Sequence, residues 1–142
     1  MHKYLLAGAA MISAAALFGA AEGARAGEGL TVAFEWLAQD RCGTASPALT
    51  VTGVPGGTAS LAITLVDLDV PGFAHGGGKT TFRGEAAIPA GAVSFNLGPC
   101  PPSGSHDYRI TVKALSSYGD ELAQGAAERP CCAQFTERQT GS

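Results

Sequence analysis

One stretch, Ser60–His75, constrains the fold more than any other part of the chain. Its first part, Ser60–Val66, is apolar and partly β-branched, which predicts a buried central strand. Its second part is polar, because Asp67 and Asp69 stand one residue apart before a Pro-Gly turn and His75 ends the stretch. Carboxylates at a strand end are costly to leave unpaired. They therefore either cap the turn through side-chain hydrogen bonds or belong to a functional site.

The rest of the chain is divided into short strand-like segments by turn residues. In Tyr108–Ala114 every second residue is apolar, which predicts a strand with one buried and one wet face. Gly76–Lys79 should be the least ordered part of this region, because each glycine raises the entropy cost of fixing the backbone. The other expected strands are Leu30–Phe34, Ala48–Thr52, Ala92–Asn96 and a return to the sheet at Thr80–Phe82.

One segment, Asp120–Glu128, is expected to be helical. Acidic residues occupy its first turn, which suits the helix dipole, and Pro130 would end it. Taken together, these segments predict a mainly β chain: an antiparallel, Greek-key-like β-sandwich with one short C-terminal helix.

The N-terminus has the pattern of a secretion signal. His2 and Lys3 give a positive start, Leu5–Ala21 is apolar and uncharged, and Ala24-Arg25-Ala26 fits a small-x-small cleavage site. A membrane anchor is the competing interpretation, but the run is rich in Ala and Gly and short for a stable span of about 20 apolar residues. Residues 1–26 are therefore predicted to be a signal peptide, and the protein to be periplasmic or secreted.

The predicted mature chain, residues 27–142, has 116 of the 142 residues, enough for one domain. Removing Lys3, Arg25 and Glu22 with the signal leaves seven basic and eleven acidic side chains, a net charge of −4. Nucleic acids and anionic membranes reward basic patches, so neither is an expected partner. The mature chain is also expected to contain no transmembrane segment.

All four cysteines, Cys42, Cys100, Cys131 and Cys132, lie in the predicted exported part. An oxidising compartment makes two disulfides the expected state. Four cysteines allow three connectivities. A bond between neighbouring residues would close a very small ring, so Cys131 and Cys132 are expected each to reach one of Cys42 and Cys100.

Several motifs occur in a characteristic order along the chain: Ser46-Pro47-Ala48-Leu49, Gly53–Thr58 (GVPGGT), Asp67–Pro71 (DLDVP), His75 and Gly98–Tyr108 (GPCPPSGSHDY). In this order they resemble the phosphatidylethanolamine-binding protein family, in its bacterial Raf-kinase-inhibitor-like branch. The resemblance covers roughly Leu30–Leu115. It implies a pocket for phosphate-type groups, formed here by Asp67, Asp69, His75, Pro99, His106 and Tyr108.

The chemistry of such a pocket is reasonable. Imidazole N–H groups donate to phosphate oxygens, more strongly when protonated, and an aspartate can fix a histidine tautomer through its other nitrogen. This chain departs from the family pattern at Leu68, Gly76 and Asp107, where the family has a proline, an aromatic residue and an arginine. These departures predict weak phosphate binding.

Other motifs near His75 are less specific. Gly78-Lys79-Thr80 lacks the earlier glycine of a phosphate-binding P-loop, and His75–Gly78 lacks the partner nucleophile motif of an esterase. Ser105 adjoins His106, so their side chains should diverge on an extended chain, which disfavours a serine hydrolase. Asp67, Asp69, His75 and His106 are competent metal ligands, but their spacing specifies no geometry.

The sequence thus favours an exported, non-enzymatic binding protein with a pocket for a small anion or a phospholipid headgroup. No catalytic residue, metal or cofactor is expected. The second hypothesis is a secreted interaction module that inhibits a kinase-like or protease-like partner. The third is a metal-dependent enzyme.

Overall fold

Seven strands and two short 3-10 helices make up residues 29–135, the part of the chain that this computed structural model describes. The predicted signal peptide, residues 1–26, lies outside the described residues, as do residues 136–142. No helix in the described part has the length and apolar character needed to span a bilayer. The elements are β1 (Thr31–Phe34), η1 (Ala38–Asp40), β2 (Leu49–Thr52), β3 (Thr58–Asp67), β4 (Gly77–Thr81), β5 (Ala87–Ile88), β6 (His106–Ser116), β7 (Glu121–Cys131) and η2 (Ala133–Phe135).

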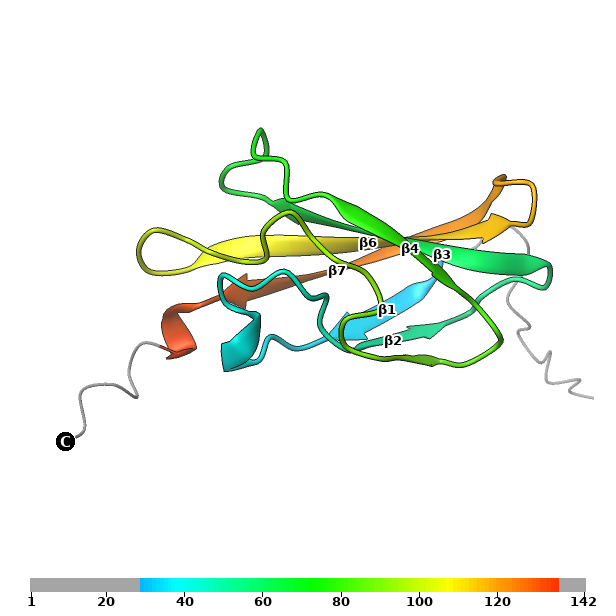
Figure 1. Ribbon diagram of the computed structural model, residues 1–142, viewed down its shortest axis with the longest axis horizontal. Coiled ribbons are helices and arrows are strands. Elements are labelled where there is room, and N and C mark those ends of the chain that lie inside the picture. The colour runs from blue at the N-terminus through cyan, green and yellow to red at the C-terminus, as the bar shows by residue number, and fades with distance from the viewer. Residues whose placement is uncertain (1–28, 136–142) are drawn as a thin grey trace, which may run out of the picture.

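The strands form two antiparallel sheets, so the prediction of a mainly β chain is confirmed (Figure 1). The smaller sheet has the order β1-β2-β5 and the larger one β4-β3-β6-β7. In the smaller sheet, Leu49 and Val51 are buried while Thr50 and Thr52 are exposed, as their alternation predicted.

Strands β3 and β6 form the centre of the larger sheet and pair along most of their length, from Ser60↔Leu115 to Asp67↔Tyr108. Alternate residues of both strands are almost completely buried, so the buried central strand and the half-buried strand predicted from the sequence are both confirmed. Because the strands are antiparallel, the last residue of β3, Asp67, and the first residue of β6, His106, lie at the same end of the sheet.

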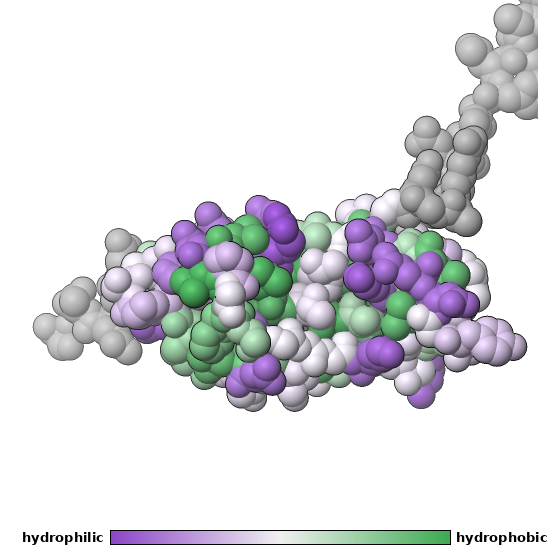
Figure 2. Space-filling view, turned by 90° about the horizontal axis from the view of Figure 1, so that it is seen from above, coloured by the Kyte–Doolittle hydropathy of each residue, from purple (hydrophilic) through white to green (hydrophobic). Residues whose placement is uncertain are grey.

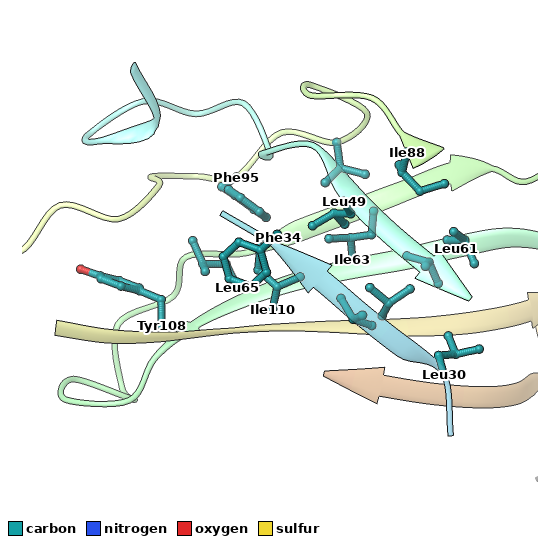
Figure 3. Packing of buried hydrophobic residues seen from close by; sticks show 14 of the residues in the cluster. Leu30, Phe34, Leu49, Leu61, Ile63, Leu65, Ile88, Phe95, Tyr108 and Ile110 are labelled. Atoms are coloured by element: carbon teal, nitrogen blue, oxygen red, sulfur yellow. The ribbon is translucent and has the colours of Figure 1, made fainter. Parts of the chain in front are cut away.

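A single core lies between the inner faces of the two sheets (Figure 3). Each fully buried Leu, Ile or Val contributes about 1.5–3 kcal/mol relative to an exposed position. Trp36 extends the core towards the end of the sheet, with its ring edge-on to those of Phe34 and Tyr108. The larger members of the core are Leu30, Phe34, Trp36, Leu49, Leu61, Ile63, Leu65, Ile88, Phe95, Tyr108 and Ile110.

The predicted helix at Asp120–Glu128 is wrong, because this segment belongs to strand β7. Local preference for a helix is weak, and pairing with β6 along nearly the whole strand overrides it. Pro130 is tolerated because β7 is the edge strand of its sheet. In the described residues, helical structure near the C-terminus is confined to the single turn η2.

The predicted strand at Ala92–Asn96 is also not formed. Val93 and Phe95 are buried, as the alternation implied, but the backbone of this segment bonds to two different loops. Phe95 N–H donates to the Thr44 carbonyl at 2.7 Å, and Asn96 N–H donates to the His75 carbonyl at 2.8 Å. One bridge, Ala45↔Ser94, is all that remains of strand pairing there.

The glycine-rich segment Gly76–Lys79, expected to be poorly ordered, instead contributes most of β4. Gly77 pairs with Thr64 of β3, and its Cα lies so close to the Ile63 carbonyl that a Cβ would collide with it. Glycine here permits a close approach between two strands. The prediction failed because composition alone does not separate this use of glycine from flexibility.

Candidate functional site

A buried carboxylate and a partly exposed imidazole form the centre of the candidate site. Asp67 ends β3 and His106 begins β6, and His106 Nδ1 donates to Asp67 Oδ2 at 2.7 Å. Asp67 is buried, whereas the His106 side chain is 19% exposed. The carboxylate fixes the imidazole tautomer, so His106 Nε2 is the nitrogen left for other contacts.

The second oxygen of Asp67 organises the turn that follows β3. Its Oδ1 accepts hydrogen bonds from the backbone N–H groups of Asp69, at 2.9 Å, and Val70, at 3.1 Å. This is the side-chain turn that Asp favours after a strand. Asp67 therefore has both of the roles that the sequence allowed. One oxygen caps the turn, and the other binds His106 in the candidate site.

The two partners shift each other's pKa in opposite directions. Burial by itself raises the pKa of Asp67, but the hydrogen bond from His106 and the two backbone N–H donors outweigh it, so the pKa falls below its ordinary value. The hydrogen bond to Asp67 raises the pKa of His106 against the opposing effect of desolvation, and the charges of Asp67 and Asp69 raise it further. The geometry thus favours a carboxylate–imidazolium pair.

His75 is buried and approaches the same region from the segment before β4. Its Nδ1 donates to the Leu97 carbonyl at 2.7 Å, so its Nε2 has no hydrogen-bond partner within residues 29–135. The imidazole lies edge-on to the Tyr108 ring, with 5.7 Å between centroids, and is tilted against the Phe73 ring at 4.7 Å. Both histidines therefore have Nδ1 bound internally.

Tyr108 packs against both histidines, and its ring is stacked on that of His106 with 6.3 Å between ring centroids. Its side chain is completely buried, and its hydroxyl has no hydrogen-bond partner in the described part of the chain. Burial and the nearby charge of Asp67 raise the pKa of the phenol, so the hydroxyl keeps its proton. Tyr108 therefore contacts both imidazoles, that of His75 edge-on and that of His106 by stacking.

A cavity of about 290 Å³ opens beside these residues. Three predicted site residues line it: Asp67, His75 and His106. The sequence did not identify the apolar part of the lining, although all of it comes from the two loops that carry the predicted motifs. Seen from above in Figure 2, hydrophobic surface gathers towards the end of the molecule where the loop between β3 and β4 stands. The additional lining residues are Val70, Phe73, Leu97, Cys100 and Pro102.

Tyr108 is not part of the cavity lining, and neither are two other predicted site residues, Asp69 and Pro99. Asp69 Oδ2 accepts from the Asp107 N–H at 2.8 Å, which ties the turn to the start of β6. Pro99 is fully buried, and its carbonyl accepts from the Cys42 N–H at 2.8 Å. Both therefore hold the loops around the cavity in place.

The three departures from the family pattern have different structural settings. Leu68 donates its N–H to the Asp107 carbonyl at 2.8 Å. Gly76 has a φ of 76° and lies against the Asn96 amide, so a larger residue would have to displace that side chain. Asp107 is exposed and alternates with His106 and Tyr108, which places its carboxylate on the opposite face of β6.

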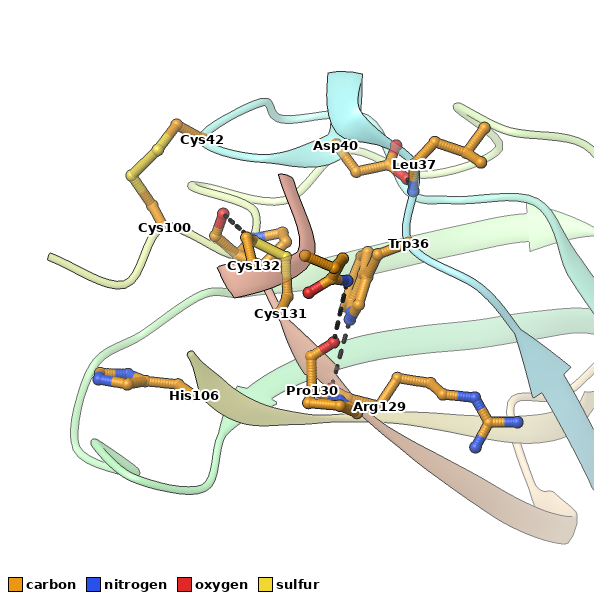
Figure 4. Close-up of a disulfide and its surroundings, with 12 residues drawn as sticks. Trp36, Leu37, Asp40, Cys42, Cys100, His106, Arg129, Pro130, Cys131 and Cys132 are labelled. Atoms are coloured by element: carbon orange, nitrogen blue, oxygen red, sulfur yellow. Dashed lines mark hydrogen bonds between the residues drawn. A yellow bond between two sulfur atoms is a disulfide. The ribbon is translucent and has the colours of Figure 1, made fainter. Parts of the chain in front are cut away.

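Two disulfides are present, and none of the four cysteines is free (Figure 4). Their connectivity differs from the expectation, because Cys42 bonds to Cys100 and Cys131 bonds to Cys132. Backbone hydrogen bonds already join the loops of the first pair and leave their Cα atoms 4.5 Å apart. Cys131 and Cys132 are instead buried at the end of β7, linked by a cis peptide bond.

One group of side chains in the described residues has the composition of a metal site. Asp67, Asp69 and His106 each offer a ligand atom, and these atoms lie within 4.8 Å of one another. His75 is not part of this group. A cation would have to replace the hydrogen bond between His106 and Asp67.

A larger hollow of about 490 Å³ lies along the smaller sheet, bordered by residues such as Ala33, Thr50 and Pro89. Glu35 is the one titratable residue among the described residues that line this hollow, and no histidine lines it. The smaller cavity beside Asp67 is therefore the better candidate for specific binding, since binding sites combine an apolar wall with a few placed polar groups.

Comparison with known proteins identifies one family. The phosphatidylethanolamine-binding protein family model matches residues 24–140. Among solved structures, the chain is similar to E. coli YbcL, described as a new member of the mammalian PEBP family. The identity is 21% and the TM-score 0.46, over 72% of this chain and 96% of YbcL. A comparison with curated proteins found no match.

Proposed function

The chain belongs to the phosphatidylethanolamine-binding protein family, and on that premise we propose that it is an exported, non-enzymatic binding protein with a pocket for a small anion or a phospholipid headgroup. The pocket is the cavity beside Asp67, His75 and His106. One observation carries the proposal: two imidazoles border one cavity, and each has Nδ1 bound to an internal acceptor. Each Nε2 then remains available to a ligand.

The arrangement suits an anionic group. Hydrogen bonds from protonated imidazole to phosphate or carboxylate oxygens are charge-assisted and stronger than neutral ones. Asp67 favours the protonated form of His106 and fixes its orientation through the 2.7 Å hydrogen bond. The pocket therefore presents a positioned donor without any lysine or arginine among its described lining residues.

Titration calorimetry with inorganic phosphate and phosphoethanolamine tests this proposal, at about one pH unit on either side of the ordinary histidine value of about 6.5. Binding should strengthen at the lower pH, because the His106 imidazole, whose pKa is raised by its hydrogen bond to Asp67, is then more fully protonated. His106→Ala should weaken binding by roughly ten- to a hundredfold, the loss expected for a hydrogen bond to a charged group.

Tyr118→Ala is the matched control, because Tyr118 is 92% exposed in the β6–β7 turn at the opposite end of the sheet. It should bind as the native protein does. Absence of heat at both pH values, from protein whose circular dichroism shows it folded, would reject the anion pocket.

One observation favours the second candidate, a secreted module that inhibits a kinase-like or protease-like partner. Val70 and Phe73 are 46% and 48% exposed on the loop that borders the cavity, and exposed apolar residues of this kind often mark interaction sites. A partner that still binds after His106→Ala would support this candidate over the first.

The third candidate, a metal-dependent enzyme, predicts metal in the purified protein at Asp67, Asp69 and His106.

Two further parts of the proposal follow from the sequence and the fold. Residues 1–26 act as a cleaved signal peptide. Sequencing the N-terminus of the exported protein tests this, and Gly27 is the expected first residue. The two sheets form a Greek-key-like sandwich, which is supported by their shared core. An experimental structure in which the sheets do not share this core would reject that description.

A further inference from the structure

We propose that the cavity beside Asp67, His75 and His106 selects an organic monoanion with a compact apolar body, such as an aromatic carboxylate, over inorganic phosphate. This inference rests on the proposed function, because it specifies the class of ligand for the same cavity. Its basis is the size of the cavity, the character of its walls and the charges around it.

The walls of the cavity are mainly apolar. Val70, Phe73, Leu97 and Pro102 line it together with the disulfide-bonded Cys100. Its volume of about 290 Å³ is near the lower end of the roughly 300–1,000 Å³ typical of small-molecule sites. Inorganic phosphate is polar on every side, so it would leave these walls without apolar contacts. A ligand with an apolar body would cover them.

The charges around the cavity disfavour a doubly charged anion. Asp67 is in the lining, and the charges of Asp67 and Asp69 both act on His106. His106 is the lining residue whose protonated form is favoured, and none of the described lining residues is a lysine or arginine. A second negative charge on the ligand would lie near Asp67, and like charges repel more strongly beside a buried carboxylate than in bulk water.

The mouth of the cavity offers a ring-sized apolar contact. Phe73 is 48% exposed, and its ring is held against His75 at a centroid distance of 4.7 Å. His75 is in turn supported edge-on by the buried Tyr108. An aromatic body seated here would cover the exposed part of Phe73, and its carboxylate would lie on the side of the imidazoles. Aromatic pairs gain energy beyond the area that they bury.

The decisive comparison uses four probes at about pH 7, where a phosphate monoester with a second pKa near 6 is mainly doubly charged. Phenylacetate should bind roughly tenfold or more tightly than inorganic phosphate, the discrimination that a small apolar contact provides. Phenyl phosphate, which has the same ring and a second charge, should bind more weakly than phenylacetate. Benzyl alcohol, which has the ring without a charge, should also bind more weakly.

Phe73→Ala separates the apolar contact from the anion contact. It should weaken phenylacetate binding by about tenfold and phosphate binding much less, because phosphate depends on the ring only through its packing on His75. Tyr118→Ala removes an exposed aromatic residue far from the cavity and should change neither affinity.

The outcomes distinguish this inference from the proposed function. Phosphate binding as tightly as phenylacetate, or Phe73→Ala weakening both ligands equally, would overturn the inference and leave the anion pocket intact. Absence of binding by all four probes to folded protein would overturn both.

Discussion

Asp67 makes two kinds of contact at once, and each depends on a different oxygen. Oδ1 accepts from the Asp69 and Val70 N–H groups, while Oδ2 accepts from His106. A local pattern of Asp after a strand predicts the first contact. The second joins residues 39 positions apart, so only the ordered motifs of the family made it predictable from the sequence.

Asp67→Asn separates these two contacts. An amide oxygen still accepts from the turn, but the charge facing His106 is lost. The pKa of His106, now raised, should therefore fall back towards its ordinary value of 6.5. A pH titration followed by NMR of the His106 ring measures this shift.

Asp69→Asn provides the matched control, because the Asp69 charge also raises the pKa of His106 but has a smaller effect than the hydrogen bond to Asp67 or the Asp67 charge. Its effect should be the smaller of the two. An equal fall in both variants would mean that general negative charge, rather than the direct hydrogen bond, sets the His106 pKa.

The same pair gives the stability of the fold a defined pH dependence. The lowered pKa of Asp67 stabilises the folded state above its ordinary value of 3.8, and this contribution is lost as pH falls through the folded pKa. The raised pKa of His106 stabilises the folded state at pH values below 6.5. This contribution is lost as the pH rises through the pKa that His106 has in the folded state. Urea unfolding at a series of pH values should show Asp67→Asn losing most stability between these limits.

At the scale of elements, periodicity identified the strands whose two faces differ most. Alternation in Tyr108–Ala114 correctly predicted part of β6, because one face packs on the core and the other is exposed. The segment that forms β7 reads as a helix because Ala, Glu and Gln are good helix formers. Its strand conformation comes from pairing with β6 and from a contact with the start of β1, neither of which is local in sequence.

Gly125 tests that contact between β7 and the start of β1. A Cβ at Gly125 would collide with the Leu30 carbonyl, so Gly125→Ala should lower the free energy of unfolding by about 1–3 kcal/mol. Urea denaturation measures the change. Gly56→Ala is the control, since no heavy atom lies within 4 Å of a Cβ built there. An unchanged stability in Gly125→Ala would show that β1 and β7 do not meet as closely as described.

At the scale of the whole molecule, the Cys42–Cys100 disulfide encloses β2, β3, β4 and β5 in one loop. The enclosed strands belong to both sheets. Cysteine count and the secretion signal predicted that all four cysteines would be paired, but not which pairs form. Pairing depends on the backbone contact between the loops at Gly43 and Gly98, which no spacing rule reveals.

Replacing Cys42 and Cys100 together by Ala should lower the free energy of unfolding by about 2–4 kcal/mol, because the unfolded chain regains the freedom that the cross-link removed. Urea denaturation under non-reducing conditions measures the loss. Peptide mapping of unreduced native protein should recover a fragment that joins Cys42 to Cys100. A fragment that joins either of them to Cys131 or Cys132 would contradict the connectivity.

The contact between the first and last strands also bears on biosynthesis. Leu30 N–H donates to the Gln124 carbonyl at 2.9 Å, and β7 is the last strand of the described chain. During synthesis, Leu30 therefore cannot form this hydrogen bond until the ribosome has made the chain as far as Gln124. Folds dominated by such distant pairings form slowly. Slow closure lengthens the time that the newly made chain spends unfolded, and an unfolded chain is the form that a protein proposed for export needs in order to pass through a translocation channel.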